Sequence, residues 1–254
     1  MRQLTHFTPA TLLFVVASCS APTSDPVEAL IKEITETRGG ARAIERIETI
    51  RTRVRIAEPG FTVVGDYRAT RSGLMRIDIY MGEQLVYSEG IDERGAWERN
   101  GGMSESAIEV SGAPEAALAH GMEFNLYGLH EYEARGHDII IDGEEDIDGT
   151  LYTVLRIRLE DGFETFFYVN PETRRTERRR DIRALHPTSD PEKRLLEMVY
   201  TGFEEACGIR DVSRSFQRDV LSGERVQETQ RLSQECNLQE DALNLDRSAP
   251  PLPQ

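Results

Sequence analysis

Apolar and polar residues alternate with a period of two in segment after segment of this sequence, and this pattern restricts the fold more than any other feature. Between residues 50 and 56, Arg51, Arg53 and Arg55 alternate with Ile, Thr and Val side chains. A segment with this period buries one face and exposes the other, as a strand of an antiparallel sheet does. Turn pairs such as Asp161-Gly162 separate it from further segments of the same kind. The sequence therefore predicts a mainly antiparallel β (α+β) protein.

The predicted strands fall into two blocks with a helical stretch between them. They begin at residue 47 and number about eleven in all. Residues 111–122 are rich in alanine and predict a helix, and residues 25–38 predict another. Helices that interrupt a long meander need an apolar surface, and the concave face of a curved sheet, which they then plug, provides one. We expect one domain over residues 25–243 and a disordered tail over residues 244–254, where three prolines occur without periodicity.

The first residues are typical of an export signal. Arg2 precedes a short apolar run, and small residues lead up to Cys19. The run is too short to cross a hydrocarbon core, which needs roughly 20 helical residues. Val16-Ala17-Ser18-Cys19 resembles the bacterial lipobox, which implies a signal peptide over residues 1–18, acylation of Cys19 and a lipidated tether over residues 19–24. A plain secretory signal with a chance cysteine is the alternative.

The charge of the chain limits its partners. A net charge of −15, with 39% hydrophobic and 30% charged residues, indicates a globular body and argues against nucleic acid as a partner. One basic cluster stands out, made up of Arg174, Arg175, Arg178, Arg179, Arg180 and Arg183. The cluster either binds lipid phosphate or an anionic partner, or it is the solvated face of an edge strand that is kept charged against aggregation. We favour the edge strand.

Two cysteines, Cys207 and Cys236, remain once Cys19 is assigned to the lipid. An oxidising compartment permits a disulfide between them. Closing a loop of about 28 residues in this way would add a few kcal/mol to stability. Two unpaired, buried thiols are the alternative.

No catalytic, metal-binding or cofactor signature occurs in the sequence. It contains no G-x-S-x-G, P-loop or dinucleotide motif. The histidines are scattered without a nearby cysteine, and the acidic run at residues 144–149 lacks the closing glutamate of a calcium loop. We therefore expect no enzyme activity, no metal and no cofactor.

Several segments resemble the LolA/LolB family of periplasmic lipoprotein-sorting proteins. They are Gly39-Gly40 ahead of Ile47–Ile50, Tyr67-Arg68, Met75–Ile77, Gly95–Trp97, residues 142–149, Leu151–Leu159 and Phe167–Thr173. The resemblance implies an unclosed antiparallel β-barrel that is covered by helices, with an apolar cavity between them. Gly208–Asp211 lacks the proline that family members often carry there, and a lipid anchor is nearer to the receptor of the family than to its soluble carrier.

The resemblance also implies which residues would line the cavity. Binding of acyl chains needs aliphatic, aromatic and methionine side chains rather than reactive groups. The inward-facing candidates are Val54, Ile56, Met75, Ile77, Met81, Leu155, Ile157, Phe167 and Val199 on strands, and Leu118 and Met122 on the plugging helix. The alternative is that these rows form a dry, packed core, as in any β-sheet domain.

On this basis we expect a monomeric envelope lipoprotein that binds a lipid, or the acyl chains of a lipoprotein, for transport or sorting at a membrane. Its lipid anchor would face the periplasm, and Ser20 after the anchored cysteine favours the outer membrane over the inner one. Two alternatives remain open: a regulatory envelope sensor that binds a partner protein on the same fold, and a structural lipoprotein with a filled core. The sequence does not identify a protein partner.

Overall fold

The computed structural model describes residues 25–252 of the chain. The predicted signal peptide over residues 1–18, the acylation of Cys19 and the tether over residues 19–24 lie outside this part of the chain. All of the described strands belong to one antiparallel sheet.

The first half of the chain supplies two helices, six strands and a long helix. They are α1 (Pro26–Arg38), α2 (Ala41–Glu45), β1 (Thr49–Glu58), β2 (Phe61–Thr70), β3 (Met75–Met81), β4 (Gln84–Asp92), β5 (Gly95–Asn100), β6 (Ile108–Glu109) and α3 (Ala113–Leu126). The second half adds η1 (Leu129–Glu131), η2 (Glu133–Arg135), β7 (Asp138–Ile147), β8 (Thr150–Arg158), β9 (Glu164–Val169), β10 (Thr176–Arg183), β11 (Arg194–Ala206), β12 (Ile209–Asp219), β13 (Arg225–Cys236) and η3 (Glu240–Leu243).

The thirteen strands follow the order β6-β5-β4-β3-β2-β1-β13-β12-β11-β10-β9-β8-β7. Pairing of β1 with β13 joins the two blocks in the middle of the sheet, and β6 and β7 are its two ends. The sheet is therefore curved but not closed. About eleven strands were expected; β6 pairs over only two residues, which is too short for a period to show in the sequence.

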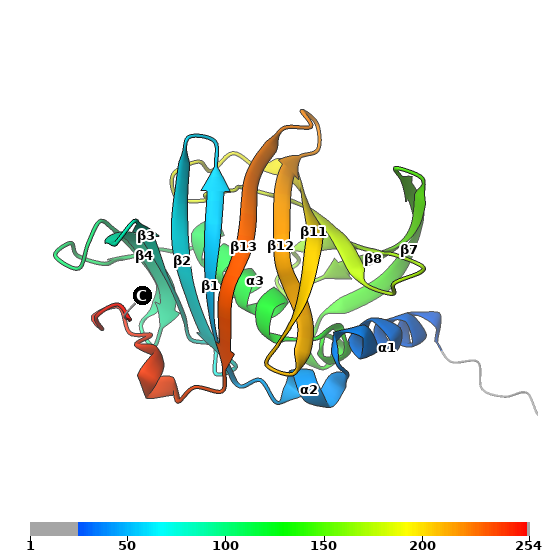
Figure 1. Ribbon diagram of the computed structural model, residues 1–254, viewed down its shortest axis with the longest axis horizontal. Helices are drawn as coiled ribbons and strands as arrows, with labels where there is room; N and C mark the ends of the chain where they lie inside the picture. The colour runs from blue at the N-terminus through cyan, green and yellow to red at the C-terminus, as the bar shows by residue number, and fades with distance from the viewer. Residues whose placement is uncertain (1–24, 253–254) are drawn as a thin grey trace, which may run out of the picture.

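The sheet wraps around α3, as the prediction of a plugged concave face required (Figure 1). In the view of Figure 1, β2, β1, β13, β12 and β11 stand in front of α3, and α1 and α2 lie along one end of the sheet. Leu118 and Leu126 of α3 are buried against inward side chains of the strands, among them Leu155 and Ile157. The unclosed barrel with helices on its inner face is thus confirmed.

Local signals account for the first helix. The Asp25 side chain accepts a hydrogen bond of 2.8 Å from the Val27 amide, with Pro26 in the first helical position. Gly39, with φ of 123°, ends the helix in a conformation that a residue with a side chain would adopt only under strain. The predicted range and the observed one agree.

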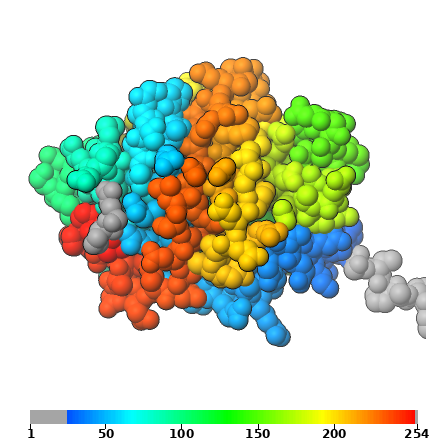
Figure 2. Space-filling model, in the orientation of Figure 1, coloured from blue at the N-terminus to red at the C-terminus, as the bar shows by residue number. Residues whose placement is uncertain are grey.

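The C-terminal segment differs from the prediction. A disordered tail was expected from residue 244, but residues 244–252 lie on the outer face of β2–β5, next to β3 and β4 in Figures 1 and 2. Nη1 of Arg76 donates to the carbonyl oxygens of Asn244, Asp246 and Ala249 at 2.7–3.2 Å. The prediction failed because the segment is held by residues far away in the sequence, through its backbone carbonyls and through Arg247, which donates to Asp92 at 2.7 Å, and such contacts leave no local period.

Candidate functional site

The inner face of the sheet does not pack fully against α3. Three adjoining chambers of about 110, 370 and 550 Å³ remain between them. The ring of Phe124, on α3, lines all three chambers. We call them the small, middle and large chambers, and together they form the candidate site.

Small side chains explain why this space is left open. α3 presents Ala113, Ala116, Ala117 and Gly121 to the large chamber, and a Cβ atom on Gly121 would meet nothing within 4 Å beyond the backbone of its own helix. Protein interiors normally reach crystal-like packing density, which would require bulkier side chains at these positions. Leu118 and Leu126 hold the helix to the core on either side of Gly121, so the helix cannot simply move inward.

The walls of the two larger chambers are mainly apolar. Met75, Ile77 and Leu118 line the large chamber, together with Pro187 and Pro191 from the segment before β11. The middle chamber is lined by Val54 and Ile56 from β1, and it shares Ile77 and Phe124 with the large one. This continuity makes room for a long, flexible apolar ligand.

The predicted cavity residues fall into three groups. Six of them line the chambers: Val54, Ile56, Met75, Ile77, Leu118 and Phe167. Three others belong to the packed core between helix and sheet and touch no chamber: Met122, Leu155 and Ile157. Met122, Leu155 and Ile157 therefore lie where the alternative of a dry, packed core expected them.

Two predicted cavity residues, Met81 and Val199, lie elsewhere. Met81 is the last residue of β3, beyond the core, and is 53% exposed. Val199 lies opposite Arg178 and Phe216 on the outer face of the sheet, and its neighbour Met198 lines the middle chamber instead. Because side chains alternate along a strand, an error of one residue in register moves a side chain to the other face.

The basic cluster is also placed differently from the favoured prediction. β10 is not an edge strand, because it pairs with β9 on one side and β11 on the other. Arg178 and Arg180 point outward to the buried carboxylate of Glu197, at 3.1 and 2.8 Å. Arg179 points inward and lines the middle chamber. Arginines of the cluster therefore lie on both faces of a strand that is paired on both sides.

Inside the cavity, Arg179 is held between an aromatic ring and a carboxylate. Its guanidinium carbon lies 4.4 Å from the centre of the Phe124 ring, and Nε is 3.1 Å from Asp181. Burial lowers the pKa of Arg179, but the attractions of Asp181, Tyr200 and Tyr132 together more than offset this and leave the pKa raised. Burial also raises the pKa of Tyr200, which lines the small and middle chambers. The cavity thus keeps a permanent cation beside the Phe124 ring.

Phe124 was not among the predicted cavity residues, and Arg179 was assigned to the solvated face of an edge strand. Phe124 lies just beyond the helix predicted over residues 111–122, and no periodic pattern marks it as inward. The alternation along β10 contains the signal for Arg179, since every second residue from Arg179 to Arg183 shares a face. The run of arginines hides that signal, because both faces carry the same residue type.

Cys207 and Cys236 form a disulfide with Cα atoms 5.9 Å apart. The bond joins the β11–β12 turn to the end of β13, and Cys207 precedes Arg210 and Asp211 of the small chamber by only a few residues. It therefore fixes one wall of that chamber to the middle of the sheet.

Two features are absent from residues 25–252. No group of three His, Cys, Asp or Glu side chains in this range is arranged to hold a metal ion. No helix in the same range is both long and apolar enough to cross a membrane.

The fold of this chain, an unclosed antiparallel barrel around a helix, is similar to that of several solved structures. A DUF1329 family protein from Desulfovibrio piger has a TM-score of 0.56 at 15% identity, covering 89% of this chain and 99% of that one. A domain assigned to outer membrane lipoprotein sorting from Vibrio parahaemolyticus has a TM-score of 0.55 at 11% identity, covering 86% and 97%. A LolA superfamily protein from Nitrosomonas europaea has a TM-score of 0.50 at 14% identity, covering 85% and 96%.

These structures confirm the predicted resemblance to LolA/LolB-like lipoprotein-sorting proteins at the level of the fold. No protein-family model matches the chain, and no curated protein is similar to it in sequence. Fold carries over more readily than role, so the function has to be argued from the cavity.

Proposed function

We propose that this protein binds a lipid, or the acyl chains of a lipoprotein, in the cavity around Phe124, for transport or sorting in a bacterial envelope. The observation that carries the proposal is the set of adjoining chambers, which small residues of α3 keep open. The fold shared with a lipoprotein-sorting domain supports the same class of ligand.

The chemistry of the site suits this role without any catalytic group. Each CH₂ group that leaves water for an apolar wall contributes roughly 0.8 kcal/mol. A chain of ten or so such groups therefore binds firmly even after the entropy of ordering it is subtracted. Met75 and Met198 in the walls are soft and unbranched, and so adapt to chains of different shape.

The location follows from the N-terminal sequence. Acylation of Cys19 would hold the folded part at a membrane surface, since two or more acyl chains anchor stably whereas one does not. The disulfide between Cys207 and Cys236 supports export, because such bonds persist in oxidising compartments. We place the protein in the envelope facing the periplasm, at the outer membrane rather than the inner one. An anchored, monomeric protein suits receiving a lipid better than shuttling it.

A structural lipoprotein with a filled core is the main alternative, and it predicts a dry, fully packed interior. Chambers of about 370 and 550 Å³ weigh against it, because they exceed the voids of a packed core by far.

Two tryptophan substitutions on β3 test the proposal. Met75→Trp places a bulky ring at the large chamber, whereas Met81→Trp adds the same ring at an exposed position on the same strand. Displacing two CH₂ groups of a ligand costs roughly 1.6 kcal/mol, so we expect Met75→Trp to weaken uptake of a fluorescent fatty acid by about tenfold. Met81→Trp should bind as the wild type does. Equal binding by all three proteins would refute a ligand in the large chamber.

A further inference from the structure

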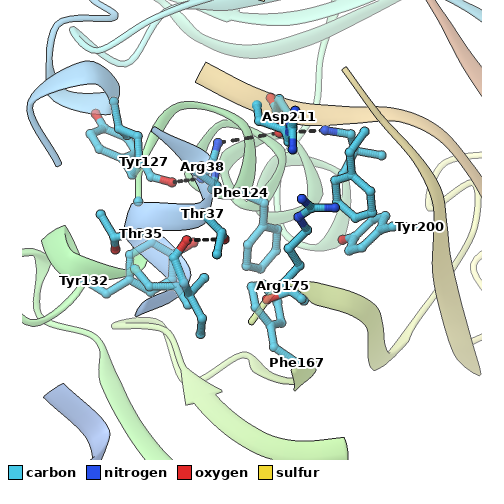
Figure 3. Close-up of a pocket in the computed structure, with 18 residues that line it drawn as sticks. Thr35, Thr37, Arg38, Phe124, Tyr127, Tyr132, Phe167, Arg175, Tyr200 and Asp211 are labelled. Carbon is cyan, nitrogen blue, oxygen red and sulfur yellow. Dashed lines mark hydrogen bonds and ion pairs between the residues drawn. The ribbon is translucent and has the colours of Figure 1, made fainter. Parts of the chain in front are cut away.

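The small chamber, like the middle one with Arg179, Arg214 and Arg231, is lined by more arginines than carboxylates. It lies between the end of α1, the start of β12 and the turn before β10 (Figure 3). Arg38, Arg175 and Arg210 line it, and Asp211 is the single carboxylate among the described residues that do so. In a chain with a net charge of −15, a chamber with excess positive charge is unusual and calls for a physical reason.

Several hydrogen-bond donors in this chamber have no partner among residues 25–252. They are the Thr35 hydroxyl, on a residue that is only 5% exposed, and the Nε atoms of Arg38 and Arg175. Buried donors are normally paired, because an unpaired one loses its bonds to water and gains nothing in return. All three belong to residues that line the chamber, so a ligand with acceptor atoms would supply a partner to each donor that it reaches.

The charges already present do not fill this role. Nη2 of Arg38 is 3.6 Å from Asp211, which is beyond hydrogen-bond distance, and Nη1 reaches the Tyr127 carbonyl only at 3.5 Å. Arg210 is 3.8 Å from the exposed carboxylate of Glu205. The guanidinium of Arg175 lies 5.3 Å from the Phe203 ring and donates no hydrogen bond within residues 25–252. Asp211 thus offsets part of the charge of three arginines.

The small chamber adjoins the middle one. Phe124, Tyr200 and Val212 line both chambers, and Arg179 of the middle chamber lies over the Phe124 ring. A ligand with its head at the arginines would therefore extend past these side chains into the apolar space. A volume of about 110 Å³ accommodates a compact group of a few atoms but leaves no room for a sugar or a second long chain.

We propose that the small chamber binds the compact anionic head of the ligand, a carboxylate or a phosphate monoester, through Arg38, Arg175 and the Thr35 hydroxyl. This inference rests on the proposed function and narrows its ligand to an acidic amphiphile. Arginine suits the role because its planar fork matches both carboxylate and phosphate oxygens.

Three ligands with one chain length separate the head from the tail. Dodecanoate, dodecyl phosphate and dodecanol are titrated, below their aggregation concentrations and at pH 8, into the chain from Ser20 onward, which keeps every residue that the structure describes. Competition with a fluorescent fatty acid gives the affinities. We expect one or both anions to bind at least about tenfold more tightly than the alcohol, and the tighter anion identifies the head as carboxylate or phosphate. Equal affinity of all three ligands would overturn the inference but would leave the lipid-binding function standing.

Matched variants locate the head. Arg175→Gln and Arg38→Gln should each weaken anion binding about tenfold and leave dodecanol binding unchanged. Arg174→Gln is the control, since Arg174 is adjacent in sequence but exposed and paired with Glu33 at 3.2 Å. Variants that weaken the anion and the alcohol equally would show that these arginines do not contact the head. Failure of every ligand to bind, including the fluorescent acid, would count against the proposed function itself.

Discussion

Two sets of arginines in this protein have different surroundings: Arg68 and Arg76 are fully buried, whereas Arg38 and Arg175 are half-buried. On the outer face, Arg68 and Arg76 lie under the C-terminal segment, and their guanidinium groups contact Asp78 and backbone carbonyls of that segment. In the cavity, Arg38 and Arg175 face open space, with no bond shorter than 3.5 Å from either guanidinium to another described residue.

This difference distinguishes arginines that stabilise the fold from arginines that are available to bind a ligand. A buried charge with its partners in place contributes to holding the chain together, and removing it leaves the partners uncompensated. A charge that faces a cavity has lost part of its hydration without gaining a partner within the protein, so its partner is expected to be a ligand. The comparison predicts that mutation in the first set lowers stability, whereas mutation in the second set weakens ligand binding and changes stability little.

The largest effect is expected from Arg76→Met. Arg76 is fully buried, is 2.9 Å from Asp78, and binds three carbonyl oxygens between residues 244 and 249. Losing it takes one of two arginines from the buried Asp78 and leaves three backbone carbonyls unpaired, so the free energy of unfolding should fall by about 3–5 kcal/mol. Urea denaturation measures the loss. A loss below about 1 kcal/mol would mean that the outer arginines are not structural.

Removal of the disulfide should have the next largest effect. In the chain-entropy model, a cross-link between residues 29 apart contributes about 3–4 kcal/mol. The double variant Cys207→Ala/Cys236→Ala should lose this stability in urea denaturation, and reduction of the wild type should reproduce the loss. If reduction left the wild type unchanged, the two thiols would not be joined in the folded protein.

Arg175→Gln should change stability by about 1 kcal/mol or less, in contrast to Arg76→Met, because its side chain donates no hydrogen bond to another described residue. The same urea titration tests this. A loss as large as that for Arg76→Met would erase the distinction between the two sets and would assign Arg175 a structural role.

The smallest effect concerns acid stability of the outer face. Burial alone would raise the pKa of Asp92, but hydrogen bonds from the Arg247 side chain and from backbone amides lower it to about 2. Because the folded-state pKa lies below the unfolded value of about 3.9, Asp92 stabilises the fold above pH 4 or so, and this contribution is lost as the pH falls toward 2. The stability difference between the wild type and Asp92→Asn should therefore shrink over this range. A constant difference would contradict the assignment.

The sequence predicted the fold well where period and turn residues agree. Residues 50–56 and the turn at Asp161-Gly162 are read correctly because one face is apolar and the other is not. The prediction failed where both faces carry similar residues, as along β10, and where bulges in β11 around Tyr200 and Gly202 change the register.

The site was predicted in part for the same reason. Val54, Ile56 and Ile77 follow from alternation alone, whereas Leu155 and Ile157 show the same alternation and yet are packed. Whether an inward residue meets a void depends on what faces it, here Gly121 on α3. Such pairs lie far apart in the sequence, and no local pattern records them.

The central claim, that the cavity holds a lipid with an acidic head, is tested most directly by native mass spectrometry of the chain from Ser20 onward, exported to a bacterial periplasm and purified without detergent. We predict a mass shift that corresponds to one or two bound amphiphiles, which lipid extraction identifies as fatty acids or phosphate-bearing lipids, and which Met75→Trp reduces but Met81→Trp does not. A protein that carries no lipid and takes up no fluorescent fatty acid would contradict the claim.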